Sequence, residues 1–236
     1  MERSRRPASN AGILKTPRRG PHVKRWDGKN RTCADWDGLR RDSELFFQNG
    51  DILVHLYAKG NSRRGPTFRV PFETLQKFNC GPLFSICFAQ LLPELQGSSP
   101  TGSGRPQDKY ELYIPAPDHV PRDDAFSWHI TTRNFFALVY RKPLVGTTMG
   151  KALVTLHDRM RMFRAKRANN HNDLLVYLEE MGYLNFAHHP DYALAVLYYA
   201  EQYQIFGLWA DAFVHCVAMN DGLYLSPEFA AISPTT

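Results

Sequence analysis

The sequence lacks the long apolar segments of a membrane or secreted protein. No run among its 236 residues approaches the roughly 20 apolar residues of a membrane-spanning helix. The N-terminal segment MERSRRPASNAGILKTPRRG contains no apolar core of the kind found in a secretory signal. We therefore expect an intracellular protein, in the nucleus or the cytoplasm, that has no membrane partner.

Cysteine is scarce, and its spacing indicates no disulfide framework. The cysteines are Cys33, Cys80, Cys87 and Cys216. They show no paired spacing, and without an export signal this arrangement is typical of reduced thiols inside a cell. The sequence therefore predicts free thiols.

Motifs for catalysis and for cofactor binding are also missing. Residues 146–152, GTTMGKA, are similar to a phosphate-binding loop, but three residues rather than four separate the glycines, and Ala152 has no hydroxyl to hold magnesium. His188 and His189 have no cysteine or second acidic residue at metal-ligand spacing. No Gly-x-Ser-x-Gly turn occurs. The sequence predicts a non-enzymatic protein without a cofactor or a metal.

Basic residues are concentrated at the N-terminal end. Residues 1–41 hold twelve Lys or Arg against four Asp or Glu, which leaves 17 of 29 basic and 19 of 23 acidic residues for the rest. The Arg, Pro, Gly and Ser content of this segment predicts a disordered basic tail. Trp26 and Trp36 are exceptions, and we expect them to dock on the folded part rather than to stay free for a partner.

The tail contains two basic clusters, at residues 3–6 (RSRR) and 15–19 (KTPRR). Such clusters are typical of nuclear-import or nucleic-acid-binding segments, and a solubilising tail is the alternative. The candidate nucleic-acid contacts are Arg5, Arg6, Lys15, Arg18 and Arg19. Because phosphate contacts release counterions, binding through these residues would be sensitive to salt.

An apolar hairpin is the centre of the predicted fold. Residues 52–57, ILVHLY, have the composition and alternation of a strand, and residues 67–70 predict a second strand. The turn between them, residues 59–66, contains Gly, Asn, Ser and Pro. Residues 72–78 predict a short helix that folds back onto the hairpin. A hairpin alone is marginally stable in water, so it needs a covering layer of helices.

The rest of the folded part is predicted to supply a third strand and that helical layer. The alternation of residues 110–114, YELYI, predicts the strand. Apolar spacings of three and four predict helices. These helices cover residues 83–92, 130–140, 149–163, 172–180, 191–205 and 208–219.

These elements predict an α+β protein with a small sheet of about three strands covered by helices. The disordered tail covers residues 1–41, and the α+β domain covers residues 42–167. An all-helical extension follows over residues 168–220, and an irregular tail over residues 221–236 ends the chain.

The order strand, turn, strand, short helix, buried helix, third strand and helix resembles the BTB/POZ domain. The segments DILVHLY, FRVPFETL and FFALVY are similar to those of the family, although Pro71 stands where a His is common. This resemblance covers about residues 50–163. Residues 200–205, AEQYQI, with Leu208 resemble a helix pair of BTB domains and their C-terminal extensions.

The chain also resembles a group of uncharacterised proteins of filamentous fungi. The shared segments are HITTRNFFALVYRKPLVG, ALVTLHDRM and AFVHCVAM. This second resemblance covers about residues 50–220.

The BTB/POZ resemblance implies a non-enzymatic protein–protein interaction module that acts as an adaptor or scaffold. Members of that family form dimers through their first helices and a swapped N-terminal strand, and some link substrates to a cullin-type ubiquitin ligase. Leu45, Phe46 and Phe47, which precede the hairpin, are the candidate contacts with a second copy or another protein. The alternative is a nuclear nucleic-acid-associated factor that binds through the basic tail.

Overall fold

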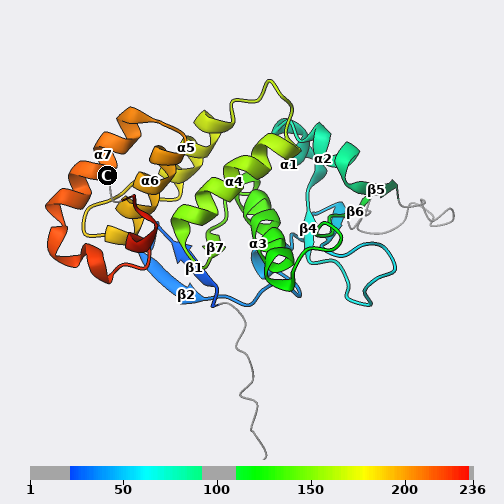
Figure 1. Ribbon diagram of the computed structural model, residues 1–236. Coiled ribbons are helices and arrows are strands. Elements are labelled where there is room, and N and C mark those ends of the chain that lie inside the picture. The colour runs from blue at the N-terminus through cyan, green and yellow to red at the C-terminus, as the bar shows by residue number, and fades with distance from the viewer. Residues whose placement is uncertain (1–21, 92–109, 234–236) are drawn as a thin grey trace, which may run out of the picture.

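The computed structural model describes residues 22–91 and 110–233 (Figure 1). The strands are β1 (Lys24–Asp27), β2 (Thr32–Asp35), β3 (Ile52–His55), β4 (Phe68–Val70), β5 (Phe88–Leu91), β6 (Tyr110–Tyr113) and β7 (Leu144–Gly146). The α-helices are α1 (Phe72–Lys77), α2 (Gly81–Ile86), α3 (Arg122–Val139), α4 (Met149–Phe163), α5 (Asn170–Glu180), α6 (Pro190–Gln202) and α7 (Phe206–Ala218). The 3₁₀ helices are η1 (Ser43–Leu45), η2 (Asn220–Leu225) and η3 (Phe229–Ala231).

The predicted hairpin lies in a sheet with the strand order β4-β3-β6-β5. Strand β3 is antiparallel to β4 and parallel to β6. Ile52 and Val54 are fully buried, while the residues that alternate with them are partly exposed. The rings of Phe68 and Phe136 lie 5.3 Å apart, so α3 packs against the buried face of the sheet. The α+β class and the sheet covered by helices are confirmed.

This sheet contains a further strand in a segment that we predicted to be helical. Helix α2 ends at Ile86, and Cys87 adopts the extended angles φ −95° and ψ 147°. Strand β5 then pairs with β6 in antiparallel register. The helix predicted over residues 83–92 is therefore wrong beyond Ile86. A short apolar run is compatible with a buried helix and with a strand. Here pairing with the free edge of β6 favours the strand.

The N-terminal segment forms a second sheet. Strand β1 pairs with β2 and also with β7, which is more than a hundred residues away in sequence. Trp26 is 3% exposed and belongs to the main core, while Trp36 is half-buried. The disordered tail predicted through residue 41 is therefore wrong for residues 24–35, and the docking of Trp26 is confirmed. Residues 1–21 lie outside the described part of the chain.

Helix α4 is the centre of the helical layer, where it contacts α2, α3, α5, α6 and β7. Its bounds are the predicted ones. Helix α3 begins at Arg122 rather than at Ile130, because Asp123 and Asp124 stabilise its N-terminus although this first part lacks an apolar stripe. Helices α5, α6 and α7 lie within a few residues of their predicted positions.

The described part of the segment predicted as an irregular C-terminal tail is folded against α6, α7 and the N-terminus of α4. It contains η2 and η3, and Glu228 is 3% exposed. The Glu228 carboxylate accepts hydrogen bonds from the backbone N–H groups of Met149 (2.5 Å) and Gly150 (3.0 Å). An acidic side chain of the chain itself thus occupies the N-terminus of α4, beside the glycines that are similar to a phosphate-binding loop. Burial raises the pKa of this carboxyl.

We expect Glu228→Ala to lower the free energy of unfolding by about 1–3 kcal/mol, because two buried N–H groups lose their acceptor. Hydrogen exchange should also become faster at the amides of Met149 and Gly150. Urea denaturation and exchange measured by NMR test both effects. Asp211→Ala, at an exposed acidic residue, is the control. Equal stability of the two variants would show that Glu228 does not fasten the C-terminal segment.

A buried ion network joins the two sheets. The Arg133 guanidinium is fully buried and donates to Asp42 (2.8 Å), to Glu44 (2.7 Å) and to the carbonyl of Pro143. Arg25 of β1 donates to the other oxygen of Glu44 (2.7 Å). The network therefore connects β1, the start of η1, α3 and the segment before β7.

We expect Asp42→Ala to lower the free energy of unfolding by about 3 kcal/mol, because it leaves a buried guanidinium incompletely paired. Urea denaturation followed by circular dichroism measures the change. The control is Lys77→Ala, which removes the exposed ion pair of Lys77 with Glu73 (2.7 Å) and should hardly change stability. A loss for Asp42→Ala as small as that of the control would contradict a structural role for the network.

Candidate protein-binding surface

The structure places the predicted partner contacts mostly inside the fold. Leu45 is fully buried, so its prediction as a partner contact is wrong. Phe46 and Phe47 are half-buried. The Arg41 guanidinium lies 3.7 Å from the centre of the Phe46 ring, and the Phe47 ring lies 5.2 Å from that of Tyr140. This segment is held against the sheet because the Phe47 N–H donates to the carbonyl of Arg69 (2.8 Å).

The candidate nucleic-acid contacts of the tail lie outside the described residues. They are Arg5, Arg6, Lys15, Arg18 and Arg19.

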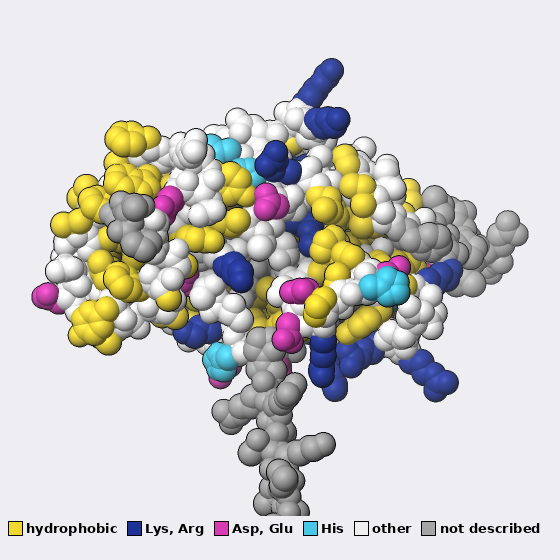
Figure 2. Space-filling model, in the orientation of Figure 1, with side chains coloured by type: hydrophobic (Ala, Val, Ile, Leu, Met, Phe, Trp, Pro, Cys, Tyr) yellow, Lys and Arg dark blue, Asp and Glu magenta, His cyan; other side chains and the backbone are white. Residues whose placement is uncertain are grey.

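The largest gathering of exposed apolar side chains lies instead at the C-terminal end of the described chain. Nine large hydrophobic side chains are exposed in the described residues, and six of them fall between residues 206 and 229. We define the α7 face as the exposed large apolar side chains of α7 itself, Phe206, Val214 and Val217. These side chains are 59–78% exposed. Figure 2 shows hydrophobic side chains gathered over the region of α7.

The α7 face arises because an apolar helix has neighbours on one side only. Ala212 and Cys216 are the buried residues of α7, and the helix packs mainly on α6 and on η2. Phe206, Val214 and Val217 are spaced by eight and three, so they share the opposite side of the helix. That side has no partner within the described chain.

Stacked aromatic rings hold one end of this face in place. The rings of Phe206 and Trp209 are 6.3 Å apart at an interplanar angle of 15°, and those of Trp209 and Phe213 are 4.7 Å apart at 10°. Trp209 and Phe213 pack against the core. Phe206 therefore presents a largely exposed ring on a fixed support, as a preformed anchor does.

The Lys, Arg, Asp and Glu residues of the segment that contains α7 carry charge of one sign. No Lys or Arg follows Arg167 in the sequence, whereas residues 168–236 contain eight Asp or Glu. Asp211 and Asp221 are exposed within and just after α7. This segment therefore combines exposed apolar side chains with exposed acidic residues, which favours a partner with basic residues around an apolar stripe.

Sequence reasoning did not single out this helix as a binding surface. The signal is that Asp211 is the one charged residue among the 13 residues of α7, a composition typical of a buried helix. An apolar helix that lacks a neighbour on one side exposes the apolar residues of that side, and within the described residues α7 does so.

The described residues contain neither a group suited to holding a metal ion nor a helix suited to spanning a membrane. Within residues 22–91 and 110–233, His, Cys, Asp and Glu do not form a group of three or more that could hold a metal ion. None of the helices in these ranges has both the length and the apolar character needed to cross a membrane.

Comparison with known proteins adds one family match. Residues 171–236 match the family described as Domain of unknown function (DUF8004), so the matched segment begins in α5 and includes the whole α7 face. No curated protein and no protein of solved structure matches the chain. The match covers less than a third of the sequence and names no activity.

We expect Val214→Lys to change the free energy of unfolding by less than about 0.5 kcal/mol, because the side chain is 65% exposed. Cys216→Lys, two residues further along the same helix, should be much less stable because its side chain is 4% exposed. Thermal denaturation of both variants tests the burial pattern of α7. A large loss of stability in Val214→Lys would mean that the α7 face is covered in the native protein.

Proposed function

We propose that this chain is a non-enzymatic protein–protein interaction module that binds its partner through the α7 face. The observation that carries the proposal is the concentration of exposed apolar side chains between residues 206 and 229 on an otherwise well-packed fold. Exposed apolar patches with polar surroundings are typical of protein–protein contact sites. The stacked rings of Phe206, Trp209 and Phe213 supply the aromatic anchors on which such contacts depend.

The partner proposed for this face is an amphipathic helix with an apolar stripe flanked by Lys and Arg. The apolar stripe would cover the exposed side chains of Phe206, Val214 and Val217, as in helix-in-groove recognition. The basic flanks would face Asp211 and Asp221, and residues 168–236 contain no Lys or Arg that would repel them. A second copy of this chain is a weaker candidate, because it would bring the acidic residues together.

The adaptor class of the proposal is supported by the arrangement of the α+β part. Strand β3, strand β4, short helices α1 and α2, strand β6 and helix α3 follow the order noted for BTB/POZ-like domains, with strand β5 added between α2 and β6. The three predicted strands β4, β3 and β6 lie side by side in the four-stranded sheet. The burial of Leu45 means that a homodimer of this chain would need another contact surface.

A synthetic amphipathic helix tests the proposal. We expect a fluorescein-labelled Leu/Lys helix of about 18 residues, or five turns, to bind the full chain, and a Leu/Glu helix with the same apolar stripe to bind at least tenfold more weakly. Fluorescence anisotropy measures both, and added salt should weaken the Leu/Lys complex.

Val214→Asp separates apolar contact from simple charge attraction. The variant adds negative charge, which by itself would strengthen the binding of a basic helix. Weaker binding is therefore expected only if the helix covers the α7 face. Val176→Asp is the matched control, because Val176 is exposed on α5 outside the α7 face. Equal binding of the two helices, or unchanged binding by Val214→Asp, would overturn the proposal. A dimer of the free chain in light scattering that Val214→Asp dissociates would replace the basic helix with a second copy.

A further inference from the structure

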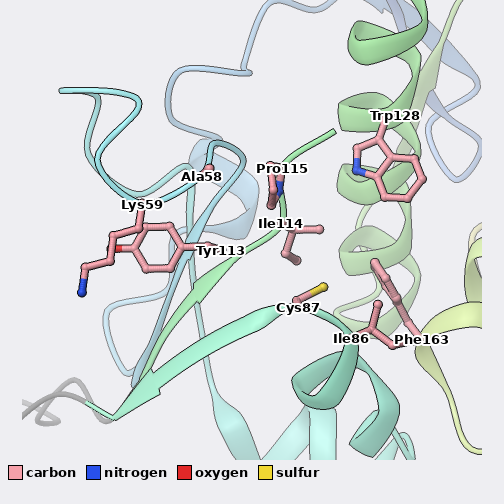
Figure 3. Close-up of a pocket in the computed structure, with 9 residues that line it drawn as sticks. All are labelled: Ala58, Lys59, Ile86, Cys87, Tyr113, Ile114, Pro115, Trp128 and Phe163. Carbon is pink, nitrogen blue, oxygen red and sulfur yellow. The ribbon is translucent and has the colours of Figure 1, made fainter. Parts of the chain in front are cut away.

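A pocket of about 370 Å³ lies at the carboxyl ends of the parallel strands β3 and β6 (Figure 3). Ala58 follows β3, Ile114 and Pro115 follow β6, and these residues form one side of the pocket. Trp128 of α3 and Phe163 of α4 form the other side. The carboxyl edge of parallel strands is a common position for ligand sites, and the volume lies within the range of small-molecule pockets.

The body of this pocket is apolar. Ile86, Ile114, Pro115 and Phe163 present hydrocarbon surface to it. Figure 3 shows the Cys87 sulfur lying between Ile114 and Phe163. Burial raises the pKa of this thiol to about 11, so the thiol is neutral and adds little polarity. Apart from Lys59 and Tyr113, the lining is apolar and fits a compact apolar group.

One polar group in the wall lacks a partner. The indole Nε1 of Trp128 is buried and has no hydrogen-bond acceptor in the described structure. In Figure 3 this nitrogen lies on the side of the ring that faces Pro115 and Ile114. A buried N–H without an acceptor destabilises a protein, so an oxygen atom of a bound molecule would relieve the cost.

A buried cation, Arg159, packs on the same wall without being one of the residues that line the pocket. The Arg159 guanidinium carbon lies 3.6 Å from the centre of the Trp128 ring and 5.1 Å from that of Phe163, and the residue is 5% exposed. Its Nη1 donates to the hydroxyl of Thr132 (2.5 Å), which carries no charge. Burial lowers the pKa of the guanidinium to about 10.

Arg159 differs in its pairing from the other buried arginines of the described chain. Arg133 donates to Asp42 (2.8 Å), and Arg164 donates to Asp173 (2.5 Å). Arg159 pairs with no carboxylate in residues 22–91 and 110–233. A buried charge is normally paired, so an anion next to the aromatic walls would complete the arrangement.

We propose that this pocket binds a monocarboxylate with a compact apolar body. The apolar body contacts Ile114 and Phe163, and the carboxylate accepts a hydrogen bond from the indole of Trp128 and lies toward the guanidinium of Arg159. A free apolar carboxylic acid and the C-terminal carboxylate of a peptide ending in an apolar residue share this chemistry. The inference does not depend on the α7 face.

Octanoate and its neutral analogue octanamide test the site on the full chain. Isothermal titration calorimetry should show octanoate binding at least tenfold more tightly than octanamide, because a charge-assisted contact is lost in the amide. Arg159→Met should weaken octanoate at least tenfold and leave octanamide unchanged. Arg161→Met is the matched control, because Arg161 is exposed on the same helix, and it should bind octanoate like the wild type.

Trp128→Phe keeps an aromatic wall and removes the N–H donor, so it should weaken both probes severalfold. A peptide ending in Leu, with a free or an amidated C-terminus, distinguishes the sources. Preference for the free peptide over octanoate assigns the site to a protein C-terminus, and preference for octanoate assigns it to a small acid. The inference fails if octanoate does not bind, if the acid and the amide bind equally, or if Arg159→Met binds like the wild type. It also fails if Arg159→Met is less stable than the wild type, since Arg159 would then be a structural residue.

Discussion

The buried guanidinium of Arg133 is the contact on which the arrangement of the two sheets depends. Asp42 and Glu44 accept hydrogen bonds from it, the carbonyl of Pro143 accepts another, and Arg25 shares Glu44. Charged groups are stable in an apolar interior only when they are paired together. The N-terminal hairpin, the entry to the four-stranded sheet and the segment before β7 therefore have to assemble around α3 as one unit.

A second arginine fastens the C-terminal helices to this unit. Arg164, just after α4, donates to the carbonyl of Phe78 (2.9 Å), to Asn170 (2.8 Å) and to Asp173 (2.5 Å). The resulting scaffold satisfies its buried charges at both junctions. Among the residues that the structure describes, however, Arg159 has only a neutral partner and the outer side of α7 has no cover. Both proposed binding features therefore contain groups that the described fold leaves in an unfavourable state. Within that described fold, Arg159 is a buried charge without a carboxylate, and α7 exposes apolar side chains.

Local sequence patterns predicted the position of an element correctly where the residues of that one segment determine its structure. The alternation in residues 52–57 located β3, and the stripe of Leu153, Leu156 and Met160 located α4 at its observed bounds. The patterns failed where a distant partner decides the outcome. Strand β1 needs β7, strand β5 needs β6, and the C-terminal segment is held through Glu228 by the N-terminus of α4. For the binding features, sequence favoured Leu45, which the structure buries, and overlooked α7.

The sequence by itself determined the α+β class, the apolar stripes of the helices and the separation of basic from acidic regions, because these follow from composition and from spacing along one segment. The tertiary structure alone decided which apolar side chains are covered and which arginines are paired. Those outcomes depend on which groups lie next to each side chain in the folded protein. Leu45 packs in the core, Arg133 pairs with two carboxylates, Arg159 donates to a hydroxyl, and Phe206 stays largely exposed.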